Sequence, residues 1–155
     1  MEHIELSEVI PCSPARLYRA WLDSGEHSAF TGSEAKVDPR VGGRFSAWAQ
    51  YITGETLELE PSRRIVQAWR TVDFPPGSPD SRLEILLEAA GAATRVTLKH
   101  SNLPDGQGEE YRQGWIDNYF DPMKTYFSSP KGQGKGRAAA KRGQHRRSAN
   151  RLKRT

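Results

Sequence analysis

The feature that most constrains the fold is a stripe of large apolar side chains late in the sequence. They recur at intervals of four residues and are Tyr111, Trp115, Tyr119 and Met123. Residues at this spacing lie on one face of an α-helix. We therefore predict an amphipathic helix of roughly 20 residues whose mostly aromatic face must be buried against another layer.

Pro122 falls inside this predicted helix. A proline has no N–H to donate, so the carbonyl of Asn118, four residues earlier, loses its helical partner. We expect a kink in the C-terminal third of the helix.

The region before this helix alternates apolar and polar residues, as strands do. Its clearest part is a hairpin about Ala90 and Gly91, and Gly54 predicts a β-bulge in an earlier long strand. Before these strands, an edge strand reaches Pro11, and two short helices follow, capped at Ser13 and Asp23. The sequence therefore predicts an α+β chain, in which a curved antiparallel sheet of about six to seven strands wraps around the long C-terminal helix.

Charge is divided unevenly along the chain. Residues 130–155 contain ten Lys or Arg and no Asp or Glu, whereas residues 1–129 contain thirteen bases and all nineteen acids. The C-terminal part has one large aliphatic side chain, Leu152, and buries too little apolar surface to offset the entropy of ordering. We expect one globular domain over residues 1–129 and a disordered basic tail over residues 130–155.

The basic tail is predicted to contact polyanions. The residues expected to do so are Lys135, Arg137, Lys141, Arg142, Arg146, Arg147, Arg151, Lys153 and Arg154. Because the tail has no aromatic side chain to stack on bases, nucleic-acid contact would follow phosphate charge and not base sequence. An anionic membrane surface and a solubilising extension without a binding role are the alternatives.

Several classes of protein are disfavoured by composition. No apolar run is long enough to span a membrane and the N-terminus does not read as a signal peptide, so we expect a cytoplasmic protein. The single cysteine, Cys12, excludes an intramolecular disulfide. The four histidines lack the spacing of metal ligands, and no phosphate-binding or nucleophile motif is present, so we expect no cofactor and no metal.

Five blocks of the sequence, in order, resemble homologues of the activator of the 90-kilodalton heat-shock chaperone's ATPase. This family is a branch of the SRPBCC or START-like, birch-pollen-allergen-like superfamily. The blocks are SPARLYRAW (13–21), VGGRF (41–45), GETLELEP (54–61), TRVTLKH (94–100) and GW (114–115). The resemblance covers residues 2–128 and leaves out the basic tail.

The resemblance implies a helix-grip fold, often with a cavity between the sheet and the helix. It also implies a possible chaperone partner and a link to the stress response. It does not imply a reaction, because the superfamily includes carriers, receptors, cyclases and co-chaperone domains on one scaffold.

Aromatic side chains facing such a cavity either fill the core or line a ligand pocket of several hundred cubic ångströms. The residues predicted to line it are Trp48, Trp69, Val96, Leu98, His100, Trp115, Tyr119 and Met123. His100 shares the parity of Val96 and Leu98, and is either a hydrogen-bonded core histidine or a polar anchor for a ligand.

The sequence therefore favours a domain that binds a small apolar or amphipathic ligand without evident catalysis. A protein-interaction module that stimulates a 90-kDa heat-shock chaperone ATPase is the alternative. It ranks second because the eukaryotic activator carries a separate clamping domain outside the resembling segments. An enzyme of unknown reaction is third.

Overall fold

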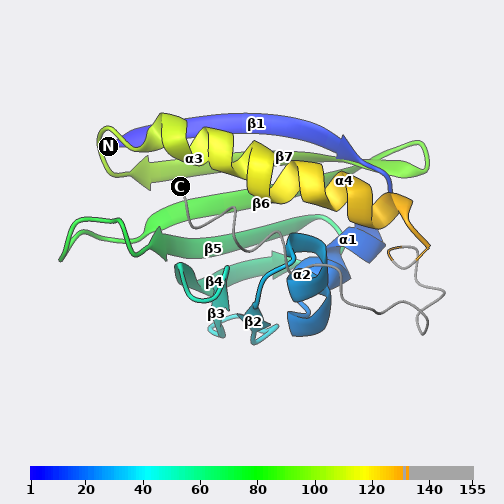
Figure 1. The fold of residues 1–155 in the computed structure, drawn as a ribbon, viewed down its shortest axis with the longest axis horizontal. Helices are drawn as coiled ribbons and strands as arrows, with labels where there is room; N and C mark the ends of the chain where they lie inside the picture. The colour runs from blue at the N-terminus through cyan, green and yellow to red at the C-terminus, as the bar shows by residue number, and fades with distance from the viewer. Residues whose placement is uncertain (131, 133–155) are drawn as a thin grey trace.

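The computed structural model describes residues 1–130 and residue 132. Its seven strands form one antiparallel sheet in the order β1-β7-β6-β5-β4-β3-β2. The strands are β1 (Glu2–Ile10), β2 (Lys36–Val37), β3 (Arg44–Ala47), β4 (Ile52–Glu60), β5 (Arg64–Thr71), β6 (Ser81–Ala90) and β7 (Ala93–Leu103). The sheet is curved and the last helical segment runs lengthwise across one of its faces (Figure 1), which confirms the predicted α+β helix-grip fold.

Two short helices connect β1 to β2, as predicted. They are α1 (Pro14–Trp21) and α2 (Ser24–Thr31). The Ser13 hydroxyl accepts the N–H of Arg16 at 3.1 Å, and the Asp23 carboxylate accepts the N–H of Glu26 at 2.8 Å. Both caps satisfy N–H groups that have no partner within their helix.

The C-terminal helix is continuous in direction but changes type in its middle. It consists of α3 (Gly108–Trp115), the π-helical turn η1 (Ile116–Phe120) and α4 (Asp121–Ser128). In the π-helical turn the N–H of Asp121 donates to the carbonyl of Ile116, five residues earlier. Pro122 follows directly in the first turn of α4. Figure 1 shows no sharp bend at the kink predicted here, and the irregularity of the helix is the π turn before Pro122.

The predicted bulge at Gly54 is wrong. Gly54 pairs in register with Phe45 and Trp69, and the irregularity in β4 lies between Thr56 and Glu58. Gly54 is required for another reason, because a Cβ there would overlap the carbonyl oxygen of Ala68 and the ring of Phe45. A glycine within a strand can mark a close approach of another backbone as well as a bulge.

The contacts of the domain continue a few residues past the predicted boundary at residue 129. Gly132 is buried, and its carbonyl accepts hydrogen bonds from the Arg16 guanidinium at 2.7 and 3.2 Å. Its N–H donates to the Ser129 hydroxyl at 3.2 Å. The basic residues predicted to contact polyanions lie outside the described part of the chain.

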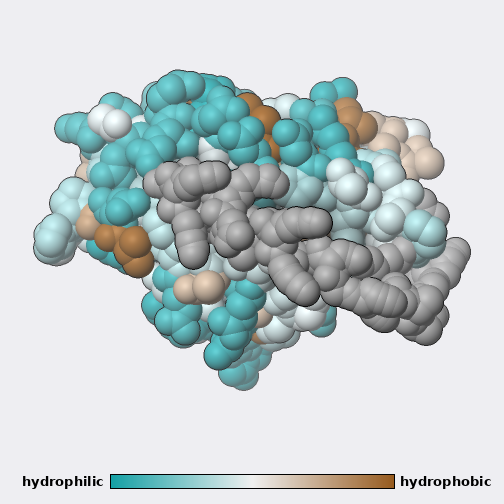
Figure 2. Space-filling model, viewed as in Figure 1, coloured by the Kyte–Doolittle hydropathy of each residue, from teal (hydrophilic) through white to brown (hydrophobic). Residues whose placement is uncertain are grey.

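Within the described residues, no helix is long and apolar enough to cross a membrane. On the face that carries the C-terminal helix, the coloured residues are mostly hydrophilic (Figure 2). The apolar side chains are instead gathered between this helix, α1, α2 and the concave face of the sheet.

Candidate functional site

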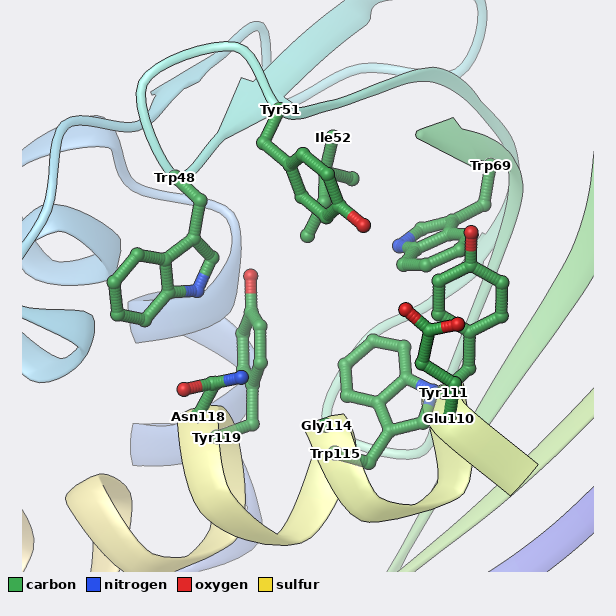
Figure 3. Close-up of a pocket in the computed structure, with 10 residues that line it drawn as sticks. All are labelled: Trp48, Tyr51, Ile52, Trp69, Glu110, Tyr111, Gly114, Trp115, Asn118 and Tyr119. Atoms are coloured by element: carbon green, nitrogen blue, oxygen red, sulfur yellow. The ribbon is translucent and has the colours of Figure 1, made fainter. Parts of the chain in front are cut away.

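A cleft of about 40 Å³ lies between the C-terminal helix and the sheet. Ten residues line it (Figure 3), namely Trp48, Tyr51, Ile52, Trp69, Glu110, Tyr111, Gly114, Trp115, Asn118 and Tyr119. A space of this size accommodates about three water-sized groups. The cleft is smaller than the roughly 300–1,000 Å³ of sites that enclose drug-sized molecules. Without a rearrangement of its walls, it has room for only one end of such a molecule.

One wall of the cleft is the connection between β3 and β4, whose backbone is strained. Trp48, Ala49 and Gln50 have φ angles of 53°, 54° and 74°. For residues other than glycine, this left-handed conformation costs roughly 1–2 kcal/mol each. Two hydrogen bonds hold the turn in place. The N–H of Ala49 donates to the carbonyl of Glu34 at 2.9 Å, and the N–H of Tyr51 donates to the carbonyl of Trp48 at 3.1 Å.

Two indole N–H groups on the walls have no hydrogen-bond partner among the described residues. The nitrogen of Trp48 is fully buried and unpaired. The nitrogen of Trp69, a residue of β5 with 4% of its surface exposed, also makes no hydrogen bond. In Figure 3 the nitrogen-bearing edges of both rings turn toward the space between them. The Trp48 nitrogen is too enclosed for a water-sized group to reach, whereas the Trp69 nitrogen is not among the fully buried unpaired atoms and is open to an acceptor in the cleft.

The opposite wall is Trp115, which a buried hydrogen-bond chain holds in place. The Trp115 indole N–H donates to Nδ1 of His100 at 3.1 Å. His100 Nε2 then donates to the Ser81 hydroxyl at 2.9 Å, and Ser81 donates to the carbonyl of Trp69 at 2.6 Å. Every donor in this series of hydrogen bonds has an acceptor only if His100 is neutral. Burial keeps it neutral, because it lowers the pKa of His100 to about 3.

Tyr119 is held in a similar way by His27 of α2. Nδ1 of His27 donates to the carbonyl of Trp21 at 2.9 Å, and Nε2 accepts from the Tyr119 hydroxyl at 2.8 Å. Burial lowers the pKa of His27 to about 4, although its bond to the Trp21 carbonyl opposes this shift. Burial also raises the pKa of Tyr119 above its ordinary value, so its hydroxyl keeps its proton.

The rim of the cleft is more polar than its walls. The Tyr51 hydroxyl donates to the Asp73 carboxylate at 2.8 Å, and the Tyr111 hydroxyl donates to the Gln107 amide oxygen at 2.8 Å. Glu110 is exposed and forms no ion pair with any described residue. The lining includes this one carboxylate and no Lys or Arg.

Four of the eight residues predicted to line a ligand cavity meet at this cleft, namely Trp48, Trp69, Trp115 and Tyr119. Three others, Val96, Leu98 and Met123, border a second void of about 10 Å³ deeper in the core. His100 lies behind Trp115 and Trp69 and reaches the cleft only through them.

Sequence reasoning missed Tyr51, Glu110 and Asn118 at the cleft and His27 behind it. Asn118 directly precedes Tyr119, which was predicted at the cavity. Both residues face the cleft because of the π turn, and no periodic sequence pattern indicates such a turn. His27 contacts Tyr119 across a sequence separation of 92 residues, which no local pattern indicates.

The described residues contain no group of three or more His, Cys, Asp or Glu that could hold a metal ion. Burial raises the pKa of the Cys12 thiol to about 11, so the thiol is protonated near neutral pH. A protonated thiol is a poor nucleophile. The cleft itself offers aromatic surface and N–H donors, which are suited to binding.

A family model described as "Activator of Hsp90 ATPase homolog 1-like protein" matches residues 11–128. The chain belongs to this family. The resemblance inferred from the five sequence blocks is thereby confirmed.

Relatives named as activators of this chaperone ATPase are 30% identical to the chain over about four fifths of its length. The "Activator of 90 kDa heat shock protein ATPase homolog" of Dictyostelium discoideum is 30% identical over 126 residues, which are 81% of this chain and 33% of the relative. The human "Activator of 90 kDa heat shock protein ATPase homolog 1" is 30% identical over 124 residues, which are 80% of this chain and 36% of the relative. The chain therefore spans about a third of the length of the curated relatives it matches.

A solved structure of the family has nearly the same extent as the helix-grip domain. It is the crystal structure of an HSP90 activator from Plasmodium falciparum, with a TM-score of 0.75 and 26% identity. The match covers 83% of this chain and 97% of that chain.

Proposed function

We propose that the chain binds a small apolar or amphipathic molecule in the cleft beside Trp115. The observation that carries this proposal is the unpaired indole N–H of Trp69 on the cleft wall, opposite a second unpaired but fully buried indole N–H, that of Trp48. Aromatic rings that served only to fill the core would be expected to turn such donors toward partners, as Trp21 does toward Gln67 at 3.3 Å.

The strained turn at Trp48 supports the same proposal. Non-glycine residues in the left-handed region persist where the surrounding structure over-determines them, and they cluster at ligand sites. Three in succession, the first of them lining the cleft, hold the Trp48 ring against the space. A π-helical turn on the opposite wall is a second local irregularity of a kind frequent at functional sites.

The second candidate function is binding to a 90-kDa heat-shock chaperone, with stimulation of its ATPase. It is favoured by the Plasmodium falciparum structure, because a chain of nearly the same extent is called an HSP90 activator. Such a partner would contact the outer surface of the domain, so its binding would not depend on the cleft.

One pair of variants separates the two functions. Asn118→Phe places a ring at the cleft, and Asp117→Phe places the same ring on the exposed side of the same π turn. We expect the neutral fluorescent probe N-phenyl-1-naphthylamine to bind the wild-type chain and Asp117→Phe equally, and Asn118→Phe at least about tenfold more weakly. Equal binding of the probe by all three proteins would contradict the cleft proposal.

The chaperone assay uses the same proteins. A several-fold rise in chaperone ATPase rate that Asn118→Phe leaves intact would support the second function, and no rise would contradict it. We expect weak stimulation at most, because the chain covers about a third of the curated activators.

A third proposal concerns the basic residues beyond the described part of the chain. Ten bases without an acid in residues 130–155 favour non-specific contact with nucleic-acid phosphates. Residues 1–129 carry an excess of acids and would repel the same phosphates, so the contact would be confined to the tail.

A further inference from the structure

We infer that the cleft takes the neutral carbonyl end of a small molecule, whose oxygen accepts a hydrogen bond from the indole N–H of Trp69. The inference rests on the proposed ligand-binding function and names the chemistry that the cleft selects. Ketones and amides are the classes of ligand that carry such a group. Trp48 forms the facing wall, and its own N–H is fully buried and has no partner.

The donor is fixed in place before a ligand arrives. The Trp69 ring meets the rings of His100 and Tyr111 edge-on at centroid distances of 4.5 and 5.3 Å, and the Trp115 ring at 5.6 Å. Its backbone carbonyl accepts the Ser81 hydroxyl at 2.6 Å. These contacts hold the ring so that its nitrogen faces the cleft (Figure 3). A preorganised donor binds an acceptor without the cost of ordering the side chain.

The charge of the lining favours a neutral acceptor over an anion. Glu110 brings a carboxylate to the rim, and no Lys or Arg lines the cleft to pair with an anion. Burying a carboxylate without a cation costs far more than burying a neutral carbonyl. The hydroxyls of Tyr51 and Tyr111 already donate to Asp73 and Gln107, which leaves the Trp69 indole N–H and the Asn118 amide as the donors on the walls without a hydrogen-bond partner among the described residues.

The size of the cleft limits how much of the molecule enters. A volume of about 40 Å³ admits about three water-sized groups, which suits an acetyl or carboxamide group. The rest of the molecule would lie at the open rim, against Tyr51 and Tyr111. This arrangement predicts that an aryl methyl ketone enters with its acetyl group first.

The test compares three molecules of similar shape, acetophenone, ethylbenzene and benzoate, in ¹H–¹⁵N spectra of the tryptophan side chains. The chain has four indole N–H signals, and that of Trp21 is the internal control because this residue lies outside the cleft lining and already donates to Gln67. We expect acetophenone to move the Trp69 signal downfield and to leave the Trp21 signal in place. We also expect it to bind about twofold to tenfold more tightly than ethylbenzene, which lacks the oxygen, and more tightly than benzoate.

Variants make the assignment specific. Trp69→Phe should bring the preference for acetophenone over ethylbenzene down to about one, whereas Trp21→Phe, which removes an indole N–H outside the cleft, should keep it. If Trp69→Phe fails to fold, the downfield shift in the wild-type chain decides the question.

The outcomes separate the failure of this inference from failure of the proposed function. Suppose that acetophenone and ethylbenzene bind equally tightly and that Asn118→Phe weakens the binding of both. This result would keep the cleft as a ligand site and overturn the carbonyl inference. Tighter binding of benzoate, or of benzylammonium through Glu110, would also overturn it. No binding of any of these molecules or of N-phenyl-1-naphthylamine would overturn both proposals.

Discussion

At the scale of single residues, two histidines determine how the cleft walls are held. His100 orients Trp115, and His27 orients Tyr119. The inward direction of His100 was predictable from its parity with Val96 and Leu98, but its partners were not, because they come from a different strand and from the helix. Both imidazoles act as neutral connectors within the core, not as groups presented to a ligand.

This arrangement predicts a decline of stability on mild acidification. The unfolded chain binds protons on these imidazoles below about pH 6.5, whereas the folded chain binds them only near pH 4 for His27 and pH 3 for His100. The unfolded state therefore binds more protons in this window, and the free energy of unfolding falls by up to about 1.4 kcal/mol per pH unit for each histidine as pH decreases. Urea unfolding at pH values between 4.5 and 6.5 measures the slope.

The control for this prediction is a set of single substitutions. His27→Gln and His100→Gln should each remove about half of the histidine-dependent slope, whereas His3→Gln, at an exposed position, should keep the wild-type slope. A slope that neither buried substitution changes would mean that the imidazoles are not the groups that destabilise the fold.

At the scale of elements, local signals predicted the type of each segment but not its irregularities. The caps at Ser13 and Asp23 and the hairpin about Gly91 follow from side-chain chemistry within a few residues. The π turn and the role of Gly54 depend on what packs against the segment. Gly54 is required by the carbonyl of Ala68 on the neighbouring strand, which no pattern within β4 could reveal.

A matched pair of glycine substitutions tests this account. Gly54→Ala should destabilise the fold by at least about 2 kcal/mol, because its Cβ would overlap backbone atoms of a central strand that cannot move away. Gly25→Ala lies in α2, where the nearest atom to an added Cβ is the Asp23 carboxylate oxygen at 3.4 Å. It should stabilise the fold by about 0.5–1 kcal/mol. Thermal unfolding of the two variants measures both effects, and similar stabilities would refute the close-approach explanation.

At the scale of the whole molecule, the order of elements was enough to predict a sheet wrapped around one aromatic helix. The cleft was not predictable in detail, because the same aromatic stripe either fills a core or leaves a space, depending on ring positions to within an ångström. Trp69 and Trp115 illustrate this, since both were predicted at a cavity but only the structure distinguishes the paired indole N–H from the unpaired one.

The last prediction concerns where the domain ends, and it uses two truncated chains. The carbonyl of Gly132 accepts two hydrogen bonds from Arg16, which also pairs with Glu26, and this carboxylate accepts the Tyr126 hydroxyl at 2.6 Å. A chain of residues 1–129 loses the contacts of Gly132 and should be less stable than residues 1–132 by about 1–2 kcal/mol, or several degrees in Tm. Residues 1–132 should match the full chain in thermal unfolding.

Both truncated chains should lose DNA binding. In the full chain, the logarithm of the DNA affinity should fall with the logarithm of the salt concentration with a slope near −5 if about six Lys or Arg side chains engage phosphates. Equal stability of the two truncations would place the end of the domain at residue 129, and DNA binding by either of them would show that the basic tail is not the binding segment.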